Sequence, residues 1–449
     1  MATPWKKILA VLCTTAILLY IFNQWIVSEL SDDILRARIL RFETTCFILS
    51  FVAIMGTINW IYLAGTFDQG RNGNVKDKSR PFFPVHIDEI LKCRQNSVKA
   101  TLWRGFLLCT IVLSLSAYTS FSLLISPNVS VLALAMFLSL AFGIQLFFAQ
   151  VVVYIVTFAM RFCRFSSIHK YRRSRLTRTI VILYAFCAVS TGFYNTFKAP
   201  EIKEVTVPIK DLPMSEMTIT FISDIHLGPT VGKAQLERVV NLINYLRSDV
   251  VIIGGDLVDG RVADLHEAVE SLDWIRSKHG VYFVTGNHEY YTADVQNWFK
   301  RLESLGVIIL HNSNVKLHGA GTDSVCLAGT DDLISNQYRL SGHKLDLDSA
   351  LKSCDQDKPV IFVAHQPAVA KLAIDSKYRT DLIVSGHTHG GQMFPLSIGA
   401  YLFNPFYAGL YQFSNNGHLY VSMGTLYWAI PCRFGTTMEI AHITLVPLE

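Results

Sequence analysis

The chain has 449 residues, 51% of them hydrophobic, and a formal net charge of +5. Residues 1–200 hold 21 Lys and Arg against 8 Asp and Glu, whereas the remainder holds 19 against 27. The length excludes one ordinary domain, and a basic surplus confined to short loops between apolar runs excludes a basic nucleic-acid-binding face. We therefore predict an all-α membrane domain, residues 1–198, and an acidic globular domain, residues 199–449.

Five apolar runs in the first domain are long enough to cross a bilayer as helices, which takes about 20 residues each. They cover residues 8–26, 46–65, 105–126, 130–159 and 179–197. The first run follows Lys6 and Lys7 and lacks a small-residue cleavage site after it, so we interpret it as an anchor and not as a signal peptide. The fifth run is the weakest, because Ser190, Thr191 and Asn195 dilute it.

The numbers of Lys and Arg in the loops between the runs predict the orientation of the chain. Loops 66–104 and 160–178 hold eight and seven, loop 27–45 holds three, and loop 127–129 holds none. If all five runs cross, the two basic loops are cytoplasmic and the globular domain is extracellular or lumenal, which is the arrangement we expect. If run 179–197 does not cross, the globular domain is cytosolic. The sequon at Asn128 lies too close to the membrane for efficient glycosylation.

The nine cysteines are scattered, with no CxxC or other zinc-finger spacing. Six lie in the first domain, mostly inside apolar runs, where cysteine behaves as a small hydrophobe. Cys326, Cys354 and Cys432 lie in the second domain, where one disulfide pair is compatible with the count. Cysteine usage therefore leaves the compartment open.

After residue 200, short β-branched runs alternate with amphipathic segments. We predict strands at 217–223, 249–254, 280–285, 307–310, 324–328, 359–364, 381–384, 418–422 and 438–446, and helices at 232–247, 262–277, 292–304 and 367–375. Continuous apolar strands that alternate with helices indicate an α/β sheet covered on both faces. The later, hairpin-like strands indicate a second sheet packed on the first.

Polar residues follow the carboxyl ends of five predicted strands. These segments are SDIHLG (223–228), GDLVDG (255–260), GNHEY (286–290), HQP (365–367) and SGHTHGG (385–391). Open α/β sheets bind their ligands at this edge. A single histidine or aspartate there is more often structural, but five strand ends that each deliver Asp, His or Asn predict a metal site.

The residue types suit a pair of divalent cations. Two ions about 3.5–4 Å apart hold a hydroxide between them and clamp a phosphate opposite it. Such a pair needs one carboxylate that bridges both ions, and neutral imidazoles that limit the total ligand charge. Asp, His and an Asn carbonyl suit Mn, Fe or Zn, and no thiolate is required.

The order DxH, GD, GNH[DE], a lone His and GHxH resembles the signature of the calcineurin-like metallophosphoesterases, and all five blocks occur in order across residues 224–389. GHTHGGQ, followed by YAGLY (407–411), YVSMGT (420–425) and PCRFG (431–435), is similar to the membrane-associated branch of bacterial type. One minor departure is GNHE, where GNHD is commoner. The resemblance covers the second domain and implies a two-sheet α/β/β/α sandwich, two bound divalent ions and hydrolysis of phosphate esters.

The resemblance also implies a role for each matching residue. The first ion would be held by Asp224, His226, Asp256 and His389, and the second by Asp256, Asn287, His365 and His387, with Asp256 bridging. His288 would contact the phosphate and protonate the leaving oxygen, and Asp259 would orient His288 or a metal histidine. Glu289 has a weaker role as a nearby packing or hydrogen-bonding partner. We expect an extended strand end to direct His387 and His389 to the two different ions.

Several residues near the blocks have no role from the resemblance. Asp331 and Asp332, and the histidines at positions 311, 318, 343, 418 and 442, are interpreted as structural or surface residues. Arg433 is either a contact to a phosphate or carboxylate near the site or a partner in a core ion pair. The aromatic stretch 393–411 is either packing or a substrate wall, and Gln392 immediately precedes it.

These observations predict a membrane-anchored, dinuclear-metal hydrolase of phosphate esters, in which a hydroxide between the ions attacks phosphorus in line. The alternatives are a phosphomonoesterase instead of a phosphodiesterase, a catalytically silent metal-binding scaffold, and a transporter with an accessory domain. The complete ligand set argues against the scaffold, and the lack of a buried acidic pair or internal repeat in the apolar runs argues against the transporter. Membrane tethering favours a lipid-linked substrate, with membrane lipids as partners.

Overall fold

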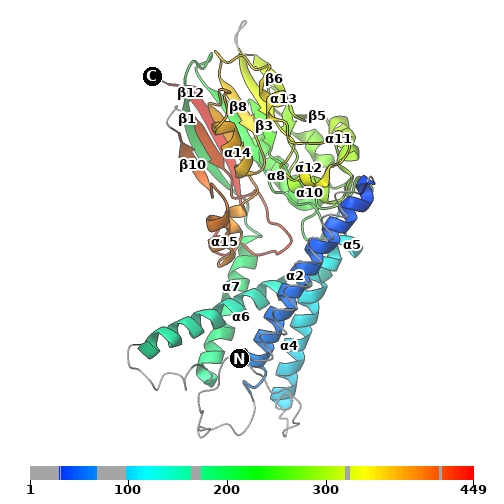
Figure 1. The fold of residues 1–449 in the computed structure, drawn as a ribbon, viewed down its shortest axis with the longest axis vertical. Helices are drawn as coiled ribbons and strands as arrows, with labels where there is room; N and C mark the ends of the chain where they lie inside the picture. Colours follow the sequence, from blue (N-terminus) through cyan, green and yellow to red (C-terminus); the bar gives the residue numbers. More distant parts are fainter. Residues whose placement is uncertain are drawn as a thin grey trace, which may run out of the picture.

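The computed structural model describes residue 30 and residues 32–67, 98–162, 172, 174–318, 324–413 and 417–448. Figure 1 shows long helices below a two-sheet sandwich, with helices on the outer faces of the sheets. The predicted run 8–26 lies outside the described residues.

Four described helices are long and apolar enough to cross a membrane. They are α2 (Asp33–Leu63), α4 (Val98–Ser116), α6 (Val131–Phe162) and α7 (Arg175–Asn195), and the short helices η1 (Ala117–Thr119) and α5 (Ser120–Leu123) continue α4. The weakest predicted run, 179–197, is thus part of a continuous helix of 21 residues. That length suffices for one crossing of a bilayer.

The predicted loop 27–45 is wrong, because α2 begins at Asp33 and replaces most of it. Asp32 caps the helix by accepting a hydrogen bond from Leu35 N. The buried Arg36 donates to the carbonyl oxygens of Tyr338 (3.2 Å) and Arg339 (3.1 Å) in the second domain. The second domain therefore stabilises Arg36 within the helix. The helix begins before the predicted apolar run 46–65 for this reason.

The second domain contains the two predicted sheets, and each is mixed and has six strands. The first has the order β1 (Glu201–Ile209), β12 (Glu439–Pro447), β2 (Met217–Ile222), β3 (Val250–Ile253), β4 (Val281–Phe283) and β5 (Val307–Ile309). The second has the order β10 (Gly409–Gln412), β11 (His418–Val421), β9 (Leu382–Ser385), β8 (Val360–Val363), β7 (Ser324–Gly329) and β6 (Ser313–His318). The three strands that the sequence pattern missed, β1, β6 and β10, are all edge strands with mixed burial.

Side chains that alternate along each strand explain why the central strands are apolar throughout. In β3, Val250 and Ile252 belong to the core between the two sheets, whereas Val251 and Ile253 belong to the core beneath the outer helices. The first sheet is covered by α8 (Lys233–Leu246), α9 (Val262–Leu265), η3 (Glu270–Trp274) and α11 (Val295–Ser304), and the second by α13 (Leu347–Leu351) and α14 (Pro367–Ile374). Both faces of both sheets are thus buried.

The predicted helix 262–277 is wrong, because the chain forms the two short helices α9 and η3 there. Leu265, Ala268, Val269 and Leu272 are all buried against the first sheet. These four positions have the i, i+3, i+4 and i+7 spacing of one helical stripe, which is why the sequence predicts a single helix there. The face that the pattern predicts to be buried is buried, although the helix is not continuous.

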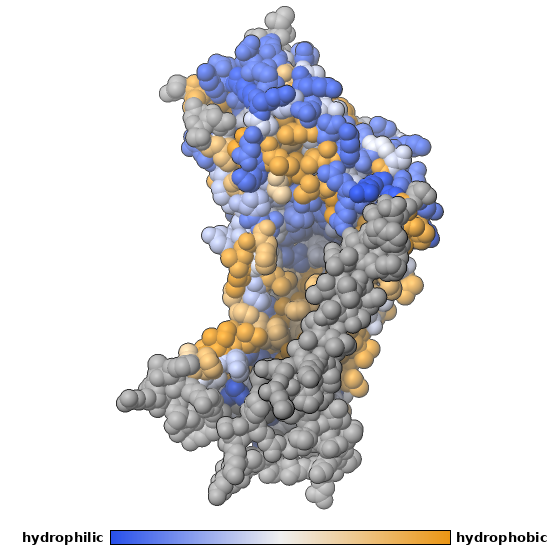
Figure 2. Space-filling view, viewed as in Figure 1, coloured by the Kyte–Doolittle hydropathy of each residue, from blue (hydrophilic) through white to orange (hydrophobic). Residues whose placement is uncertain are grey.

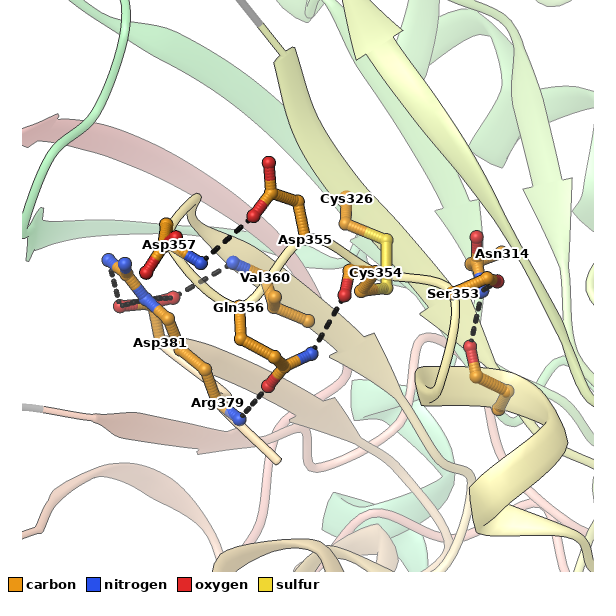
Figure 3. Close-up of a disulfide and its surroundings, with 11 residues drawn as sticks. Asn314, Cys326, Ser353, Cys354, Asp355, Gln356, Asp357, Val360, Arg379 and Asp381 are labelled. Atoms are coloured by element: carbon orange, nitrogen blue, oxygen red, sulfur yellow. Dashed lines mark hydrogen bonds and ion pairs between the residues drawn. A yellow bond between two sulfur atoms is a disulfide. The ribbon is translucent and has the colours of Figure 1, made fainter. Parts of the chain in front are cut away.

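One disulfide joins Cys326 in β7 to Cys354 after α13 (Figure 3). Both cysteines are buried in the core beneath α13 and α14. This is the single pair that the cysteine count of the second domain allowed. Cys432 is buried as a free thiol.

The sandwich packs on the long apolar helices through the segment that follows β11. Arg433 N donates to the carbonyl oxygen of Gly192 in α7 (2.9 Å), and Asn195 Nδ2 donates to the carbonyl oxygen of Arg433 (2.8 Å). A Cβ atom at Gly192 would overlap Cys432 Sγ, so glycine is what permits this close approach. A second contact joins Ser130 N, before α6, to the carbonyl oxygen of Pro229.

Candidate metal centre

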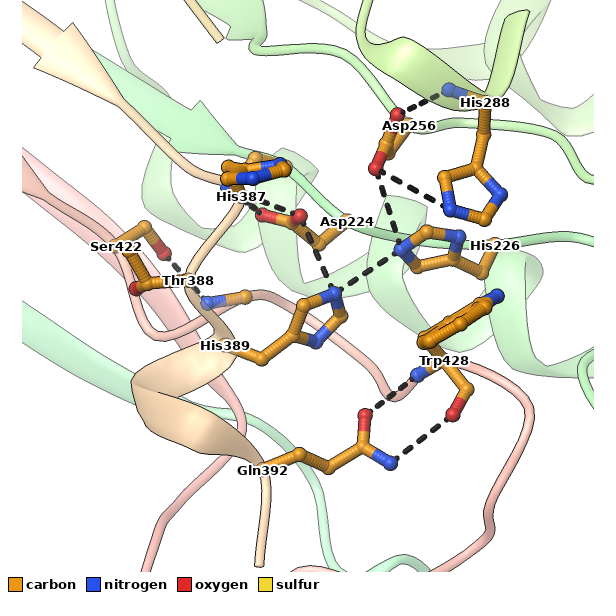
Figure 4. A network of polar contacts seen from close by, with 12 residues as sticks. Asp224, His226, Asp256, His288, His387, Thr388, His389, Gln392, Ser422 and Trp428 are labelled. Atoms are coloured by element: carbon orange, nitrogen blue, oxygen red, sulfur yellow. Dashed lines mark hydrogen bonds and ion pairs between the residues drawn. The ribbon is translucent and has the colours of Figure 1, made fainter. Parts of the chain in front are cut away.

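All seven predicted ligands lie at the carboxyl ends of strands from both sheets. Asp224 and His226 follow β2, Asp256 follows β3, Asn287 begins α10 (Asn287–Tyr291) after β4, His365 follows β8, and His387 and His389 follow β9. Parallel strands point their carboxyl ends to one edge, so five segments far apart in the chain meet there. Figure 4 shows Asp224, His226, Asp256, His387 and His389 around one space.

The first group of donor atoms comes from Asp224, His226 and His389, all three buried and within 4.8 Å of one another. His389 Nε2 lies 3.3 Å from Asp224 Oδ1 and 3.0 Å from His226 Nε2 (Figure 4). The Nδ1 atom of His226 faces Asp259 Oδ1 at 2.9 Å, which leaves Nε2 directed at the group. This is the arrangement that a metal-binding imidazole needs.

The second group comes from Asp256, His365 and His387, with donor atoms within the same 4.8 Å limit. His365 Nδ1 donates to the carbonyl oxygen of Gly254 (2.7 Å), and its Nε2 lies 3.2 Å from Asp256 Oδ2. Asn287 Nδ2 donates to the Tyr291 hydroxyl (2.9 Å). Among the described residues, the buried Asn287 Oδ1 and His365 Nε2 have no hydrogen-bond partner, so both are free to bind a cation.

Asp256 lies between the two groups. Its Oδ2 atom is 3.2 Å from His365 Nε2 in the second group and 3.7 Å from His226 Nε2 in the first. Its Oδ1 atom accepts a hydrogen bond from His288 N (2.8 Å), which holds the carboxylate in this orientation. A single buried carboxylate that faces both groups fits the geometry of a bridging ligand.

Five of the seven predicted ligands have a backbone conformation that is uncommon for residues other than glycine. The φ angles are 57° at Asp224, 55° at His226, 53° at Asp256, 72° at His387 and 51° at His389. Each such residue costs on the order of 1–3 kcal/mol unless its surroundings stabilise it, and such residues cluster at functional sites. The uncommon conformation of these five residues therefore serves the geometry of the site and does not stabilise the fold.

The expectation of an extended strand end at His387 and His389 is wrong. Both residues are left-handed, and His389 starts the short helix η4 (His389–Gly391), within which Gly390 has a φ of 56°. The tight turn, and not strand alternation, sends His389 to the first group and His387 to the second. Gly391 also has a positive φ, and a Cβ there would overlap Ser397, so glycine is required for the turn.

Asp259 and His288 lie beside the first group. Asp259 Oδ1 is 2.6 Å from His288 Nδ1 and 2.9 Å from His226 Nδ1, so one carboxylate contacts both rings. His288 Nε2 faces the centre, 4.0 Å from Asp256 Oδ2. Burial opposes protonation of His288, but the charges of Asp256 and Asp259 outweigh it and raise its pKa to about 9.

The charges of the proposed ligands differ, because burial opposes protonation of His365 but Asp256 outweighs it and raises the His365 pKa. Burial opposes ionisation of Asp224, but the neighbouring His389 outweighs it and holds the Asp224 pKa below its usual value. Asp256 behaves alike beside His365 and His288. Burial lowers the pKa of His387 and of His389 to about 4, so both imidazoles are neutral at pH 7. Carboxylates with neutral imidazoles are the donors that Mn, Fe and Zn accept.

Glu289 and Arg433 hold the backbone of the site in place. Glu289 accepts from the backbone N–H groups of Asp256 (3.1 Å), Leu257 (2.9 Å) and Gly286 (2.6 Å), which ties two ligand segments together. The fully buried Arg433 donates to the carbonyl oxygens of His389, Met423, Gly424 and Leu426. In the structure, Arg433 therefore holds the backbone of the His389 turn in place.

The segment that follows the His389 turn connects the site with the long apolar helix α6. Its residues are Gln392, Met393 and Phe394. The Gln392 side chain donates to the carbonyl oxygens of Trp428 and Ile430 and accepts from Trp428 N. Met393 is fully buried against Ala141 of α6, and the Phe394 ring packs on Phe148 of α6 with centroids 5.0 Å apart. These contacts favour packing over a substrate wall as the role of this part of the aromatic stretch 393–411.

Trp428 and Tyr291 had no role in the sequence analysis. The Trp428 ring lies 5.2 Å from the His288 ring and 6.5 Å from that of Tyr118, at the end of α4. Tyr291 orients the Asn287 amide from four residues further along α10. The spacing of four residues between Asn287 and Tyr291 is a sequence signal that could have predicted this role. The position of Trp428 depends on its contact with His288, which is distant in the chain.

A separate cluster of His311, Asp331 and His343 lies outside the two groups. Asp331 Oδ1 is 2.6 Å from His311 Nδ1, and Asp331 Oδ2 is 3.3 Å from His343 Nδ1. His343 Nε2 also contacts Gln296 Nε2 (2.6 Å). These contacts support the structural interpretation of the three residues.

The two-sheet sandwich with this ligand edge is of the metallophosphoesterase class. The family model described as calcineurin-like phosphoesterase matches residues 217–391. The chain is 45% identical over 286 residues to transmembrane protein with metallophosphoesterase domain of Bos taurus, covering 62% of this chain and 64% of the relative. It is 44% identical over 275 residues to the Danio rerio protein of the same name, covering 60% and 63%.

A more distant relative is an uncharacterized metallophosphoesterase of Aquifex aeolicus, 32% identical over 214 residues, which cover 46% of this chain and 78% of the relative. The chain belongs to the calcineurin-like phosphoesterase family. The alignments span less than two thirds of the length of the Bos taurus and Danio rerio relatives.

Proposed function

We propose that residues 199–449 form a dinuclear-metal hydrolase of phosphate esters, anchored in a membrane by residues 1–198. The observation that carries this proposal is the position of Asp256, whose Oδ2 atom faces His226 at 3.7 Å and His365 at 3.2 Å. Two groups of donors around one shared carboxylate support binding of two ions and not one.

In this proposal, Asp224, His226, Asp256 and His389 hold the first ion, and Asp256, Asn287, His365 and His387 hold the second. The unpartnered Asn287 Oδ1 and His365 Nε2 support their assignment as ligands. Two Mn, Fe or Zn ions, when bound, would supply an activated water as the nucleophile and would neutralise the phosphate charge.

His288 is the proposed general acid. The contact of its Nδ1 atom with Asp259 fixes the ring and leaves Nε2 directed at the centre, where it would donate a proton to the leaving oxygen. Asp259 positions His288 and His226 together. Trp428 packs against His288 and would limit the access of water to that ring.

We further propose that the catalytic domain lies outside the cytoplasm. The contacts of α2, α4 and α7 with the sandwich are made by the helix ends at Arg36, Tyr118 and Asn195. Loop 66–104 connects the other ends of α2 and α4, and loop 160–178 connects α6 with the other end of α7. The positive-inside rule predicts that these basic loops are cytoplasmic. The buried Cys326–Cys354 disulfide supports the same arrangement, because disulfides persist in oxidising compartments.

The full chain, purified in detergent with Mn²⁺, should hydrolyse bis(p-nitrophenyl) phosphate or p-nitrophenyl phosphate. We expect EDTA to abolish activity, fresh Mn²⁺ to restore it, and Asp256→Asn to lower kcat by at least about a hundredfold. Equal hydrolysis by wild type and Asp256→Asn would sink the proposal. Comparing the two substrates separates a diesterase from a monoesterase.

Metal analysis separates the catalytic proposal from a silent scaffold. We expect two ions per chain in wild type and fewer in Asp256→Asn. Two bound ions without turnover on either substrate would favour the scaffold. For the topology, a protease site after residue 448 should be cleaved by protease added outside intact cells, or only after organelle membranes are opened. Cleavage on permeabilising the plasma membrane alone would place the domain in the cytosol.

A further inference from the structure

Helix α15 (Leu396–Phe403) is an apolar helix with no buried residue. Leu402 is 67% exposed and Phe403 is 87% exposed, and Leu396, Ile398 and Tyr401 are also exposed. A contiguous apolar patch of this kind is uncommon on a water-facing surface and marks a contact with a membrane or another molecule. The sequence analysis placed α15 within the aromatic stretch 393–411 without assigning it a helix.

The structure holds α15 next to the membrane helices. Phe394, immediately before it, packs on Phe148 of α6 and accepts a hydrogen bond from Gln145 Nε2 through its carbonyl oxygen. Figure 1 shows α15 between the sandwich and α7, on the side of the sandwich that faces the long helices. Figure 2 shows hydrophobic surface at α15 and on the helices below it. Exposed large hydrophobic residues of α6 and α7 include Ile155, Phe158, Leu183 and Phe186.

The metal centre lies directly behind α15. The turn η4, which carries His389, precedes α15 by a few residues and contacts it. Gly391 of that turn packs so closely on Ser397 of α15 that a Cβ atom would overlap it. On another side of the centre, Trp428 lies between His288 and Tyr118 of the membrane helices. The ligand edge of the sandwich therefore faces the long apolar helices.

We propose that α15 lies in the lipid interface beside α7 and that the metal centre hydrolyses a phosphate ester of a membrane lipid, whose acyl chains remain in the bilayer. This inference rests on the proposed function and names its substrate class. Interfacial helices bury their apolar residues at the boundary of headgroups and acyl chains, which is the level of a lipid phosphate. Water adds its oxygen to phosphorus, the bond from phosphorus to the leaving oxygen breaks, and that oxygen takes up a proton.

The position of α15 is tested without any activity measurement. The full chain is placed in nanodiscs that contain phosphatidylcholine with a diazirine-labelled acyl chain, and cross-linked peptides are identified by mass spectrometry. We expect lipid cross-links on residues 396–403 and none on Tyr245 of α8, which is 78% exposed on the sandwich. The absence of lipid from residues 396–403, or cross-links there to a second copy of the chain, would overturn the inference.

The substrate class is tested with the variant Leu402→Asp/Phe403→Asp. Nanodiscs supply phosphatidylglycerol, phosphatidylinositol, phosphatidylethanolamine and phosphatidic acid together, and products are measured by mass spectrometry. We expect the variant to hydrolyse the lipid at least about tenfold more slowly than wild type, while its rate on bis(p-nitrophenyl) phosphate stays within about twofold. The matched control Tyr245→Asp should leave both rates unchanged. Leu402→Met/Phe403→Leu keeps the apolar surface and should retain the lipid rate.

The outcomes separate this inference from the proposed function. If wild type hydrolyses bis(p-nitrophenyl) phosphate but none of the four lipids, the lipid inference is wrong and the proposed function stands. If the Asp variant loses both activities equally while its thermal midpoint is unchanged, α15 acts on the centre and not on the membrane, which also overturns the inference. If Asp256→Asn equals wild type on every substrate, the proposed function itself is wrong.

Discussion

Asp259 and His288 are joined by a contact of 2.6 Å between Oδ1 and Nδ1. The same oxygen lies 2.9 Å from Nδ1 of His226, so one buried carboxylate orients the proposed acid and a proposed metal ligand together. The Asp259 side chain therefore connects the proposed proton donor, His288, with the proposed metal ligand His226. A change at Asp259 should therefore disturb catalysis without unfolding the sandwich.

We predict that Asp259→Asn lowers kcat by about 10–100-fold and changes KM much less. The amide keeps the shape of the side chain, but it carries no charge to hold two imidazole N–H groups. The measurement is steady-state hydrolysis of bis(p-nitrophenyl) phosphate, with metal content determined in parallel. Asp264→Asn on the exposed face of α9 is the matched control. An unchanged kcat in Asp259→Asn would show that the carboxylate does not position His288.

Gly192→Ala should weaken the packing of the sandwich against α7. The added Cβ would overlap Cys432 Sγ and come within 3.2 Å of Phe434 Cβ. Overpacking of this kind costs about 1–3 kcal/mol. We expect a lower thermal midpoint, and partial recovery in Gly192→Ala/Cys432→Ala, which removes the overlapping sulfur. Gly105→Ala, where nothing lies within 4 Å, is the control; a loss as large there would contradict the explanation.

Reduction of the disulfide should destabilise the catalytic domain. Cys326 and Cys354 are 28 residues apart, and closing a loop of this size stabilises the fold by about 3–4 kcal/mol in the chain-entropy model. Dithiothreitol should lower the thermal midpoint of wild type and leave that of Cys326→Ala/Cys354→Ala unchanged. Peptide mapping without reductant checks the pairing. If reductant has no effect on wild type, the bond does not form in the folded protein.

The pair of His311 and Asp331 predicts a dependence of stability on pH. The hydrogen bond to Asp331 raises the pKa of His311, and burial opposes it less strongly. Because the folded-state pKa is above the unfolded value of about 6.5, the stabilisation is complete below that pH and is lost as the pH rises through the folded-state pKa. His343 faces the other oxygen of Asp331, and the Phe299 ring lies 5.5 Å from His311.

We therefore expect the thermal midpoint of wild type to exceed that of His311→Gln by most at about pH 6 and to approach it by about pH 9. Melting curves of both proteins across this range provide the measurement. His318→Gln, at an exposed position on β6, is the control. A difference between wild type and His311→Gln that grows with pH would have the wrong sign for this pair.

The central strands and the ligand set were predictable from the sequence because their signals are local. β3 reads as an unbroken apolar run, since Val250 and Val251 face two different cores. His387 and His389 stand in the last of five short segments that together point to a metal site before any contact is known. The edge strand β10 was not predicted, because only half of its four residues are even partly buried, which leaves little apolar signal in the sequence.

The start of α2 and the roles of Arg433 and Phe394 were likewise beyond the sequence. The sequence pattern places Arg36 in a loop, but the carbonyl oxygens of Tyr338 and Arg339 stabilise it inside a helix. The four carbonyl oxygens that Arg433 braces come from two separate segments of the chain. No local pattern records these partners.

The sequence by itself determined the family and identified the candidate metal ligands, since both depend on residue types at short spacings. Only the tertiary structure decided that these residues form two groups about Asp256, and that the ligand edge faces the membrane helices. The physical reason is that both results depend on pairs distant in the chain. Phe394 with Phe148 and Trp428 with Tyr118 are examples, and their contacts exist only once the two parts have packed together.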